Sequence, residues 1–300
     1  MPLTGPAELL RLVVAAEPSR PLVTFYDDAA GERIELSAKT FDNWVAKTAN
    51  LLVDGLDAEP GDRVAIALPP HWQTAVWLFA CWSAGLAVEP IDPAGAAASD
   101  AEIVVVAGTG PPGGAPAARD LVGLSLHAMG APLPDCPPGV VDYAAEVRAY
   151  GDRFAPYSPV DPDGTALVLP AAETAAETAA ETAGTAGSEE PAATEQTSGA
   201  RESNVIKTTY SGTELVERAR VAAENWGLDA QSRVLVDMPF TTLTGLLAGL
   251  IAPIYAQGSV IICRNLDKVT LDQRVSVERV TAVAGVAGWD EPSVYVRRLP

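Results

Sequence analysis

Hydroxyl-bearing and glycine residues that could hold a phosphate group fall in two short stretches of the chain. The first stretch contains Thr182, Gly184, Thr185 and Gly187, and the second is Thr197-Ser198-Gly199. Such loops bind phosphate through backbone N–H groups and hydroxyls, normally with a lysine that offsets the ligand's charge. Glu189 and Glu190 stand where the first stretch would need that lysine, and carboxylates repel a triphosphate. The first stretch is therefore a candidate phosphate loop without its cation, and the sequence places no catalytic residue beside it.

Two further patterns resemble catalytic motifs but lack necessary parts. Gly108 to Gly113 matches GxGxxG, yet two prolines stand where a dinucleotide site would begin its helix, so we interpret it as a proline-rich loop. Ser125 and His127 do not form GxSxG, and no orienting acid or oxyanion hole is evident for a triad. We expect His127 and His71 to be surface or partly buried residues without a chemical role.

The charge of the chain excludes several classes of partner. Its 300 residues carry 39 acidic and 20 basic side chains, giving a net charge of −19. Nucleic acids and anionic membranes attract clustered lysine and arginine, and the sequence has no such cluster. Three scattered cysteines and two histidines show no metal-ligand spacing, so we predict no metal site and no resident cofactor.

The apolar segments of the chain predict a cytoplasmic protein. The first residues have neither the basic region nor the apolar region of a signal peptide. Residues 243–262 are apolar enough to be compared with a membrane span, but they contain Pro253, Gln257 and Gly258. We therefore predict a buried helix followed by a core strand in that segment.

Hydrophobic patterning predicts an α/β protein with layered, mostly parallel sheets and flanking helices. A short amphipathic helix before Arg20 precedes a hairpin of residues 22–26 and 32–36, and strands alternate with helices up to residue 107. This alternation is typical of a parallel sheet. The further predicted helices cover residues 41–52, 72–84, 143–150, 213–226 and 243–255, and the further strands cover 63–68, 87–91, 103–107, 165–169, 233–238 and 259–263. A last helix and strand fall within 271–286, and residues 295–300 have the pattern of an exposed tail.

An acidic, repetitive segment interrupts this pattern. Glu173, Glu177 and Glu181 mark a four-residue A-E-T-A repeat, and seven acidic residues but one arginine lie between Glu173 and Glu202. We interpret the segment as a solvated low-complexity insert. The chain is then divided into a first α/β subdomain (1–169), the insert (170–204) and a second α/β subdomain (205–300) that packs on the first. A tolerated surface expansion is favoured over a binding tail because long polar loops cost little stability.

Several segments resemble the N-terminal part of the adenylate-forming superfamily, which comprises acyl-CoA synthetases and their AMP-binding relatives. The resembling segments are Ile34-Glu35-Leu36-Ser37, Glu59-Pro60-Gly61-Asp62-Arg63-Val64-Ala65-Ile66, Ala84-Gly85-Leu86-Ala87-Val88-Glu89-Pro90-Ile91-Asp92-Pro93, Val234-Leu235-Val236-Asp237-Met238-Pro239-Phe240 and Tyr255-Ala256-Gln257-Gly258-Ser259-Val260. The likeness extends over most of the chain at low identity. Within the superfamily, the sequence most resembles a small actinobacterial branch. It implies the fold of the large N-terminal domain of acyl-CoA synthetases, in truncated form.

The departures from the family's pattern concern its chemistry. In the family, the strand matching residues 165–169 leads into a Thr/Ser/Gly-rich loop that ends in Pro-Lys and holds the phosphates of ATP. Here Pro170 and the acidic insert follow instead, and Thr241-Thr242 stand at the family's aromatic or histidine gate near the acyl pocket. Beyond about residue 290 the chain is expected to lack the Tyr-Gly-x-Thr-Glu segment, the ribose-binding aspartate, the hinge and the C-terminal domain with its catalytic lysine. The resemblance thus implies a fold without the charge stabilisation on which adenylate formation depends.

Three functions remain open from the sequence. The preferred one is a degenerate acyl-CoA synthetase-like protein without ligase activity, which binds a small acyl or nucleotide ligand or a protein partner. The second is an active or split acyl-adenylating enzyme that uses ATP and Mg²⁺ and is completed by a partner chain. The third is an interaction module that acts through the acidic insert.

Overall fold

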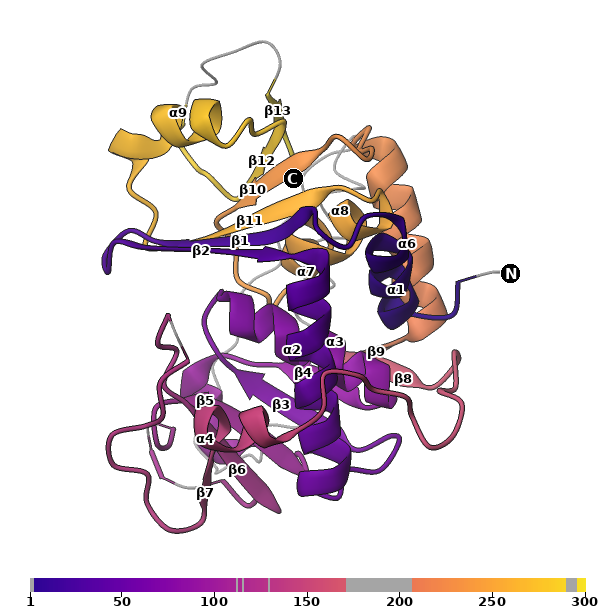
Figure 1. Cartoon of the computed structure of the whole chain (residues 1–300), viewed down its shortest axis with the longest axis vertical. Coiled ribbons are helices and arrows are strands. Elements are labelled where there is room, and N and C mark those ends of the chain that lie inside the picture. The colour runs from indigo at the N-terminus through magenta and orange to yellow at the C-terminus, as the bar shows by residue number, and fades with distance from the viewer. Residues whose placement is uncertain (1–2, 112, 115, 129, 171–206, 290–295) are drawn as a thin grey trace, which may run out of the picture.

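Two β-sheets organise the described part of the chain, which comprises residues 3–111, 113–114, 116–128, 130–170, 207–289 and 296–300 of a computed structural model (Figure 1). Sheet A has the strand order β13 (Arg297–Arg298), β12 (Ala282–Ala284), β10 (Arg233–Val236), β11 (Ser259–Arg264), β1 (Pro21–Asp27) and β2 (Glu32–Ser37). Sheet B has the order β7 (Val140–Asp142), β6 (Asp120–Leu124), β5 (Ile103–Ala107), β3 (Arg63–Ala67), β4 (Ala87–Pro90), β8 (Thr165–Pro170) and β9 (Lys207–Ser211).

Both sheets are parallel except at one edge. Strand β2 pairs antiparallel with β1 in sheet A, and β9 pairs antiparallel with β8 in sheet B. An antiparallel edge strand on a parallel sheet is common in α/β folds. The predicted fold class of layered, mostly parallel sheets is confirmed.

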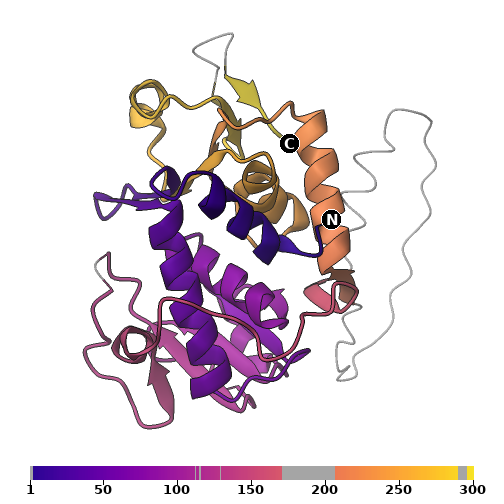
Figure 2. The ribbon, with the colours of Figure 1, turned by 45° about the vertical axis from the view of Figure 1, so that its right-hand side comes forward.

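Helices fill the space between the sheets and cover their flanks. They are α1 (Pro6–Ala16), α2 (Ala38–Asn50), α3 (Trp72–Ala84), α4 (Tyr143–Glu146), α6 (Gly212–Asn225), α7 (Leu243–Leu246), α8 (Ala252–Tyr255) and α9 (Lys268–Val277). Helices α2 and α3 lie between the two sheets: α2 contacts β1 and β2, and α3 contacts β3, β4 and β1 (Figure 1). Helices α1 and α6 lie beside one another at the side of this central layer (Figure 2).

The main core is the layer that α2 and α3 form. Phe41 of α2 and Phe79 of α3 meet edge to face with ring centroids 5.7 Å apart, and both are fully buried. Burying side chains of this size contributes about 2–3 kcal/mol each. A second cluster lies on the opposite face of sheet A, where Leu271 and Val275 of α9 pack against β10 and β11.

Local signals in the sequence account for the ends of the central helices. Ser37 begins α2, and its hydroxyl oxygen accepts a hydrogen bond from the backbone N–H of Thr40 at 3.1 Å. Gly85 ends α3 with a left-handed conformation at φ 76°, which glycine adopts without steric cost. The predicted helix over residues 72–84 and the hairpin of β1 and β2 are confirmed, whereas α2 begins three residues before the predicted residue 41.

Two predicted features differ from the structure, and three strands were not predicted. The helix expected over residues 243–255 consists of α7 and α8 joined by a π-helical turn (Leu247–Ile251), since Pro253 lacks the N–H that a regular helix needs there. The exposed tail is wrong, because β13 pairs with β12 and the apolar side chains of Val296 and Leu299 are buried beside it. Strands β6, β7 and β9 were not predicted.

The two sheets do not follow the order of the chain. Sheet A combines β1 and β2 from the first segment (1–169) with β10 to β13 from the third (205–300), whereas β9 of the third segment belongs to sheet B. The division at residues 169 and 205 therefore describes sequence order rather than sheet membership. Among the described residues, none of the helices combines the length and apolarity needed to cross a bilayer.

Candidate functional site

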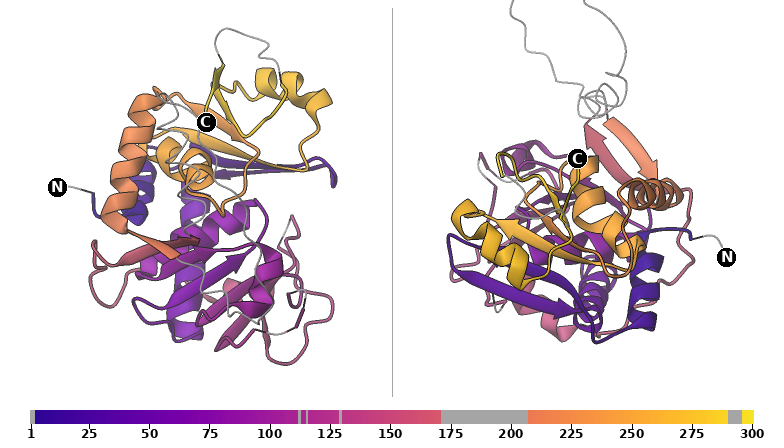
Figure 3. Two further views of the ribbon diagram at one scale, coloured as in Figure 1. Left: turned by 180° about the vertical axis from the view of Figure 1, so that it is seen from behind. Right: turned by 90° about the horizontal axis from the view of Figure 1, so that it is seen from above.

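The edge of sheet B where β8 ends is the place at which a phosphate loop was expected. Pro170, the last residue of β8, is the cross-strand partner of Lys207, the first residue of β9. The two strands lie side by side, as seen from above (Figure 3, right). The chain therefore leaves sheet B and returns to it at adjacent positions. The candidate residues Thr182, Gly184, Thr185 and Gly187 belong to the segment between these positions and lie outside the described residues.

Lys207 is a cation at this edge that the sequence analysis did not single out. Its Nζ lies 2.7 Å from Glu89 Oε1 and 3.5 Å from Asp100 Oδ1. Glu89 belongs to β4, and its side chain is only 9% exposed. The buried carboxylate thus holds the lysine against the sheet.

Arg63 at the start of β3 is the second cation of the group. Its Nη1 lies 3.3 Å from Glu89 Oε2 and 3.0 Å from Asp100 Oδ1, and its Nη2 donates to the backbone oxygen of Asp100 at 2.8 Å. The hydrogen bond from Arg63 is the main reason that the pKa of Asp100 is lowered. We call Arg63, Glu89, Asp100 and Lys207 the β8–β9 mouth cluster.

The electrostatics of the mouth cluster limit what it can bind. Its two cations are matched by two carboxylates, so its formal charge is zero. An incoming phosphate would have to compete with Glu89, whose two oxygens are each in an ion pair. Phosphate sites normally present unpaired N–H groups and a free cation. The lysine is therefore placed near the expected loop but is paired with a carboxylate of strand β4.

The other residues of chemical interest have structural positions. His71 is fully buried rather than at the surface: it begins α3, its Nδ1 accepts from the N–H of Gln73 at 3.1 Å, and its ring meets Phe25 edge to face. Burial lowers the pKa of His71 to about 3, so the ring is neutral at pH 7. The Ser125 hydroxyl donates to the backbone oxygen of Ala131 at 2.5 Å and accepts from the backbone N–H of His127 at 3.3 Å, so its hydrogen bonds hold the local turn.

Two segments named from the sequence are also accounted for. The GxGxxG stretch follows β5, and its described residues, 108–111 and 113, form turns rather than the start of a helix. Thr242, at the position of the family's gate, begins α7 and accepts from the N–H of Gly245 at 2.9 Å. Within the described ranges, no three His, Cys, Asp or Glu side chains are grouped so that they could hold a metal ion.

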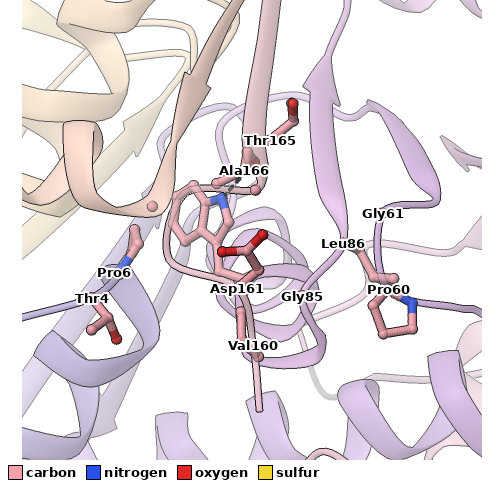
Figure 4. A pocket seen from close by; sticks show the side chains of 14 residues that line it. Thr4, Pro6, Pro60, Gly61, Gly85, Leu86, Val160, Asp161, Thr165 and Ala166 are labelled. Atoms are coloured by element: carbon pink, nitrogen blue, oxygen red, sulfur yellow. Dashed lines mark hydrogen bonds between the residues drawn. The ribbon is translucent and has the colours of Figure 1, made fainter. Parts of the chain in front are cut away.

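A pocket of about 190 Å³ lies at the opposite end of β8 (Figure 4). Thr165 and Ala166 line it, roughly 16 Å along the strand from Pro170 at about 3.3 Å per residue. Five glycines and the indole of Trp82 contribute to its wall, and Trp82 Nε1 donates to the backbone oxygen of Ala166 at 3.0 Å. Asp161 is the one charged side chain among its lining residues, so this pocket does not attract phosphate.

Comparisons with known proteins agree with this architecture. A sequence model of the family described as "AMP-binding enzyme" matches residues 10–109. A protein of Mycobacterium tuberculosis (strain ATCC 25618 / H37Rv) named "TIGR03089 family protein" is 34% identical over 284 residues, which cover 94% of this chain and 98% of that protein.

Solved structures of acyl-CoA and adenylate-forming enzymes share the fold. The anthranilate CoA ligase AuaEII, solved with anthranoyl-AMP, has a TM-score of 0.68 at 12% identity, and the match covers 94% of this chain and 49% of that one. Acetoacetyl-CoA synthetase from Streptomyces lividans has a TM-score of 0.68 at 14% identity, covering 93% and 42%. The N-terminal domain of FACL13 from Mycobacterium tuberculosis has a TM-score of 0.62 at 14% identity, covering 94% and 62%. The chain thus spans between two fifths and two thirds of these three chains.

Proposed function

The chain belongs to the TIGR03089 protein family and has the fold of the N-terminal domain of adenylate-forming enzymes, and from this premise we propose that it is a binding or regulatory protein without ligase activity. It acts in the cytoplasm on a small acyl or nucleotide ligand, or on a protein partner. The fold is preserved, and the change lies in the charges around the expected phosphate loop.

One observation carries this proposal. The cation beside the expected loop, Lys207, is paired with the buried carboxylate of Glu89, and Arg63 is paired with the same residue. Stabilising the charge on a transferring phosphoryl group requires cations that are free to approach it. Glu189 and Glu190 add further negative charge in the sequence of the candidate loop.

Two measurements test the proposal. Titration calorimetry with ATP and Mg²⁺ is expected to give no heat of triphosphate binding, and exchange of labelled pyrophosphate into ATP is expected to stay at background with a panel of short acyl and aryl acids. Robust exchange with any acid of the panel would end this proposal. AMP in place of ATP distinguishes loss of phosphate binding from loss of the whole nucleotide site.

The likeness to larger solved enzymes favours a second candidate function. AuaEII was solved with anthranoyl-AMP, and this chain matches 49% of it. An ATP-dependent acyl-adenylating enzyme completed by a partner chain would fit that relationship. Pyrophosphate exchange that appears only after a co-purified partner is added supports the second candidate.

The acidic insert supplies a third candidate function, that of an interaction module. Deletion of residues 171–198 separates it from the first proposal. The deletion is expected to leave ligand binding unchanged if the α/β body is functional, and to abolish partner binding if the insert itself is the functional part.

A further inference from the structure

A second cavity, of about 320 Å³, lies on the outer side of α1 and α2. The segment 152–156 and Ser83 at the end of α3 close its remaining sides. It shares no lining residue with the pocket of Figure 4 or with the β8–β9 mouth cluster. We call it the α1–α2 groove. Its volume falls at the lower end of the range for small-molecule pockets, roughly 300–1,000 Å³.

The floor of the α1–α2 groove is apolar. Leu10 of α1 and Val45 and Ala46 of α2 are buried and belong to its lining, and Phe154 is partly buried and packs against the main core. A ligand with a hydrocarbon or aromatic body would lie over this buried floor and cover the partly exposed side chains of Ala7 and Phe154, which is favourable in proportion to the apolar area covered.

The rim of the groove has a net positive formal charge, opposite in sign to that of the whole chain. Arg11, Lys39 and Arg153 line it together with Asp42 and Asp152, so cations outnumber carboxylates although the whole chain carries −19. Lys39 pairs with Asp42 at 3.2 Å, whereas Arg11 reaches Glu8 only at 4.0 Å on an exposed helix surface. Exposed pairs at that distance contribute little.

Arg153 is the cation best placed to bind a ligand. Within the described ranges its guanidinium makes no hydrogen bond or ion pair, while its backbone is held in place. Asn50 Nδ2 donates to the backbone oxygens of Gly151 and Arg153 at 2.9 and 3.0 Å, and Lys47 Nζ donates to that of Tyr150 at 2.5 Å. A fixed backbone that carries an uncommitted guanidinium reduces the ordering cost of binding.

We propose that the α1–α2 groove binds a small organic carboxylate with an apolar body, its carboxylate held by Arg153 and its body on the floor. The planar guanidinium matches a carboxylate in two parallel hydrogen bonds, which selects this head group over an uncharged one. The inference does not rest on the proposed function, because no residue of the mouth cluster takes part in it.

The test uses 4-phenylbutyrate as the probe, the full chain, and titration calorimetry at 0.15 M salt. The carboxylate is expected to bind at least tenfold more tightly than 4-phenyl-1-butanol, which has the same body and no charge. Arg153→Glu is expected to weaken the binding of 4-phenylbutyrate at least tenfold. The midpoint of thermal unfolding is expected to stay unchanged, because the Arg153 side chain makes no hydrogen bond or ion pair among the described residues.

Arg279→Glu is the matched control, since Arg279 is also exposed, makes no side-chain pair among the described residues and lies two residues after the last residue of α9. It changes the net charge equally and is expected to alter affinity by less than twofold. Equal loss in both variants, full binding by Arg153→Glu, or equal binding of the alcohol and the carboxylate each overturns the proposal.

Discussion

Glu89 and Lys207 belong to strands β4 and β9, which are not neighbours in sheet B, and their side chains meet as an ion pair over the intervening strand β8. The pair joins the segment that precedes the acidic insert to Lys207, the first described residue after it. Its effect on anion binding and on stability can be separated by experiment.

Replacing Glu89 by Gln is expected to raise the affinity for inorganic tripolyphosphate. The change takes the formal charge of the mouth cluster from zero to +1 and leaves Lys207 with Asp100, an exposed carboxylate 3.5 Å away, as its ion-pair partner. The expected gain is about 1 kcal/mol, or several-fold in affinity. It also costs about 1–2 kcal/mol of folding stability, because Glu89 loses its charge and with it both ion pairs. The cost is smaller than for a fully buried pair, since Arg63 and Lys207 are partly exposed. Titration calorimetry and urea unfolding measure the two effects. Glu17→Gln at the exposed end of α1 is the charge-matched control, and an equal gain there would contradict the argument.

Glu278 is expected to make the protein lose stability in acid. Burial disfavours its charged form, but hydrogen bonds from Tyr26, Arg233 and Arg33 outweigh this and hold its pKa at about 2. Because the folded-state pKa lies below the unfolded value of 4.5, the stabilisation is present above pH 4.5 and is lost as the pH falls towards 2. Glu278→Gln should cost about 3 kcal/mol at pH 7 and much less at pH 2.5. A constant difference between the two proteins across this range would refute the assignment.

His71 is expected to give an earlier acid response. Its pKa falls from 6.5 to about 3 on burial, so the unfolded chain binds a proton that the folded chain does not. Stability is therefore complete above pH 6.5 and declines by at most about 1.4 kcal/mol per pH unit below it. His71→Asn, which keeps a side chain able to begin α3, should remove the decline between pH 6.5 and 5. The urea midpoints of both proteins at pH 7.5 and 5.5 test this prediction. If the variant loses as much stability between these pH values as the original protein, His71 is not the cause.

Gly285, which follows β12, is expected to tolerate alanine less well than Gly31, which has a similar backbone conformation but open surroundings. Both have left-handed backbones, at φ 77° and 66°, so alanine costs about 1 kcal/mol at either position from the backbone alone. A Cβ on Gly285 would also lie 2.2 Å from Met238 Cγ and 2.4 Å from the backbone oxygen of Asp237, whereas Gly31 has open space. Gly285→Ala should lose more than about 3 kcal/mol and Gly31→Ala about 1 kcal/mol in urea unfolding. Similar losses of stability in the two variants would contradict this prediction, because they would mean that Asp237 and Met238 after β10 move to make room for the added Cβ.

The central strands and helices were predictable because each carries its own signal. Strand β3 is apolar on both faces, and α2 and α3 have recognisable end residues in Ser37 and Gly85. Strand β6 was missed because it lies in a Pro/Gly-rich region and contains Gly123, where a Cβ would lie 2.4 Å from the backbone oxygen of Gly108. A close backbone approach leaves no hydrophobic pattern to detect.

The mouth cluster could not be predicted because its parts are far apart in the sequence. Nothing local marks Lys207 as the partner of Glu89, since that contact depends on β4, β8 and β9 becoming neighbours. The burial of His71 was mispredicted for a similar reason. A histidine that follows two prolines has the sequence pattern of a surface turn. Its burial depends on Phe25 of sheet A, which is remote in the sequence and contacts the ring in the folded protein.

The position of β1 has a consequence for synthesis on the ribosome. Its parallel neighbour in sheet A is β11, and Asp27 accepts a hydrogen bond from Asn265 across 238 residues. The hairpin of β1 and β2 must therefore wait with one edge uncovered until β11 has emerged, while most of sheet B can already assemble. Contacts of such long range slow folding and expose a strand edge to other chains. Nascent chains halted before residue 259 should consequently be the ones that most need a chaperone.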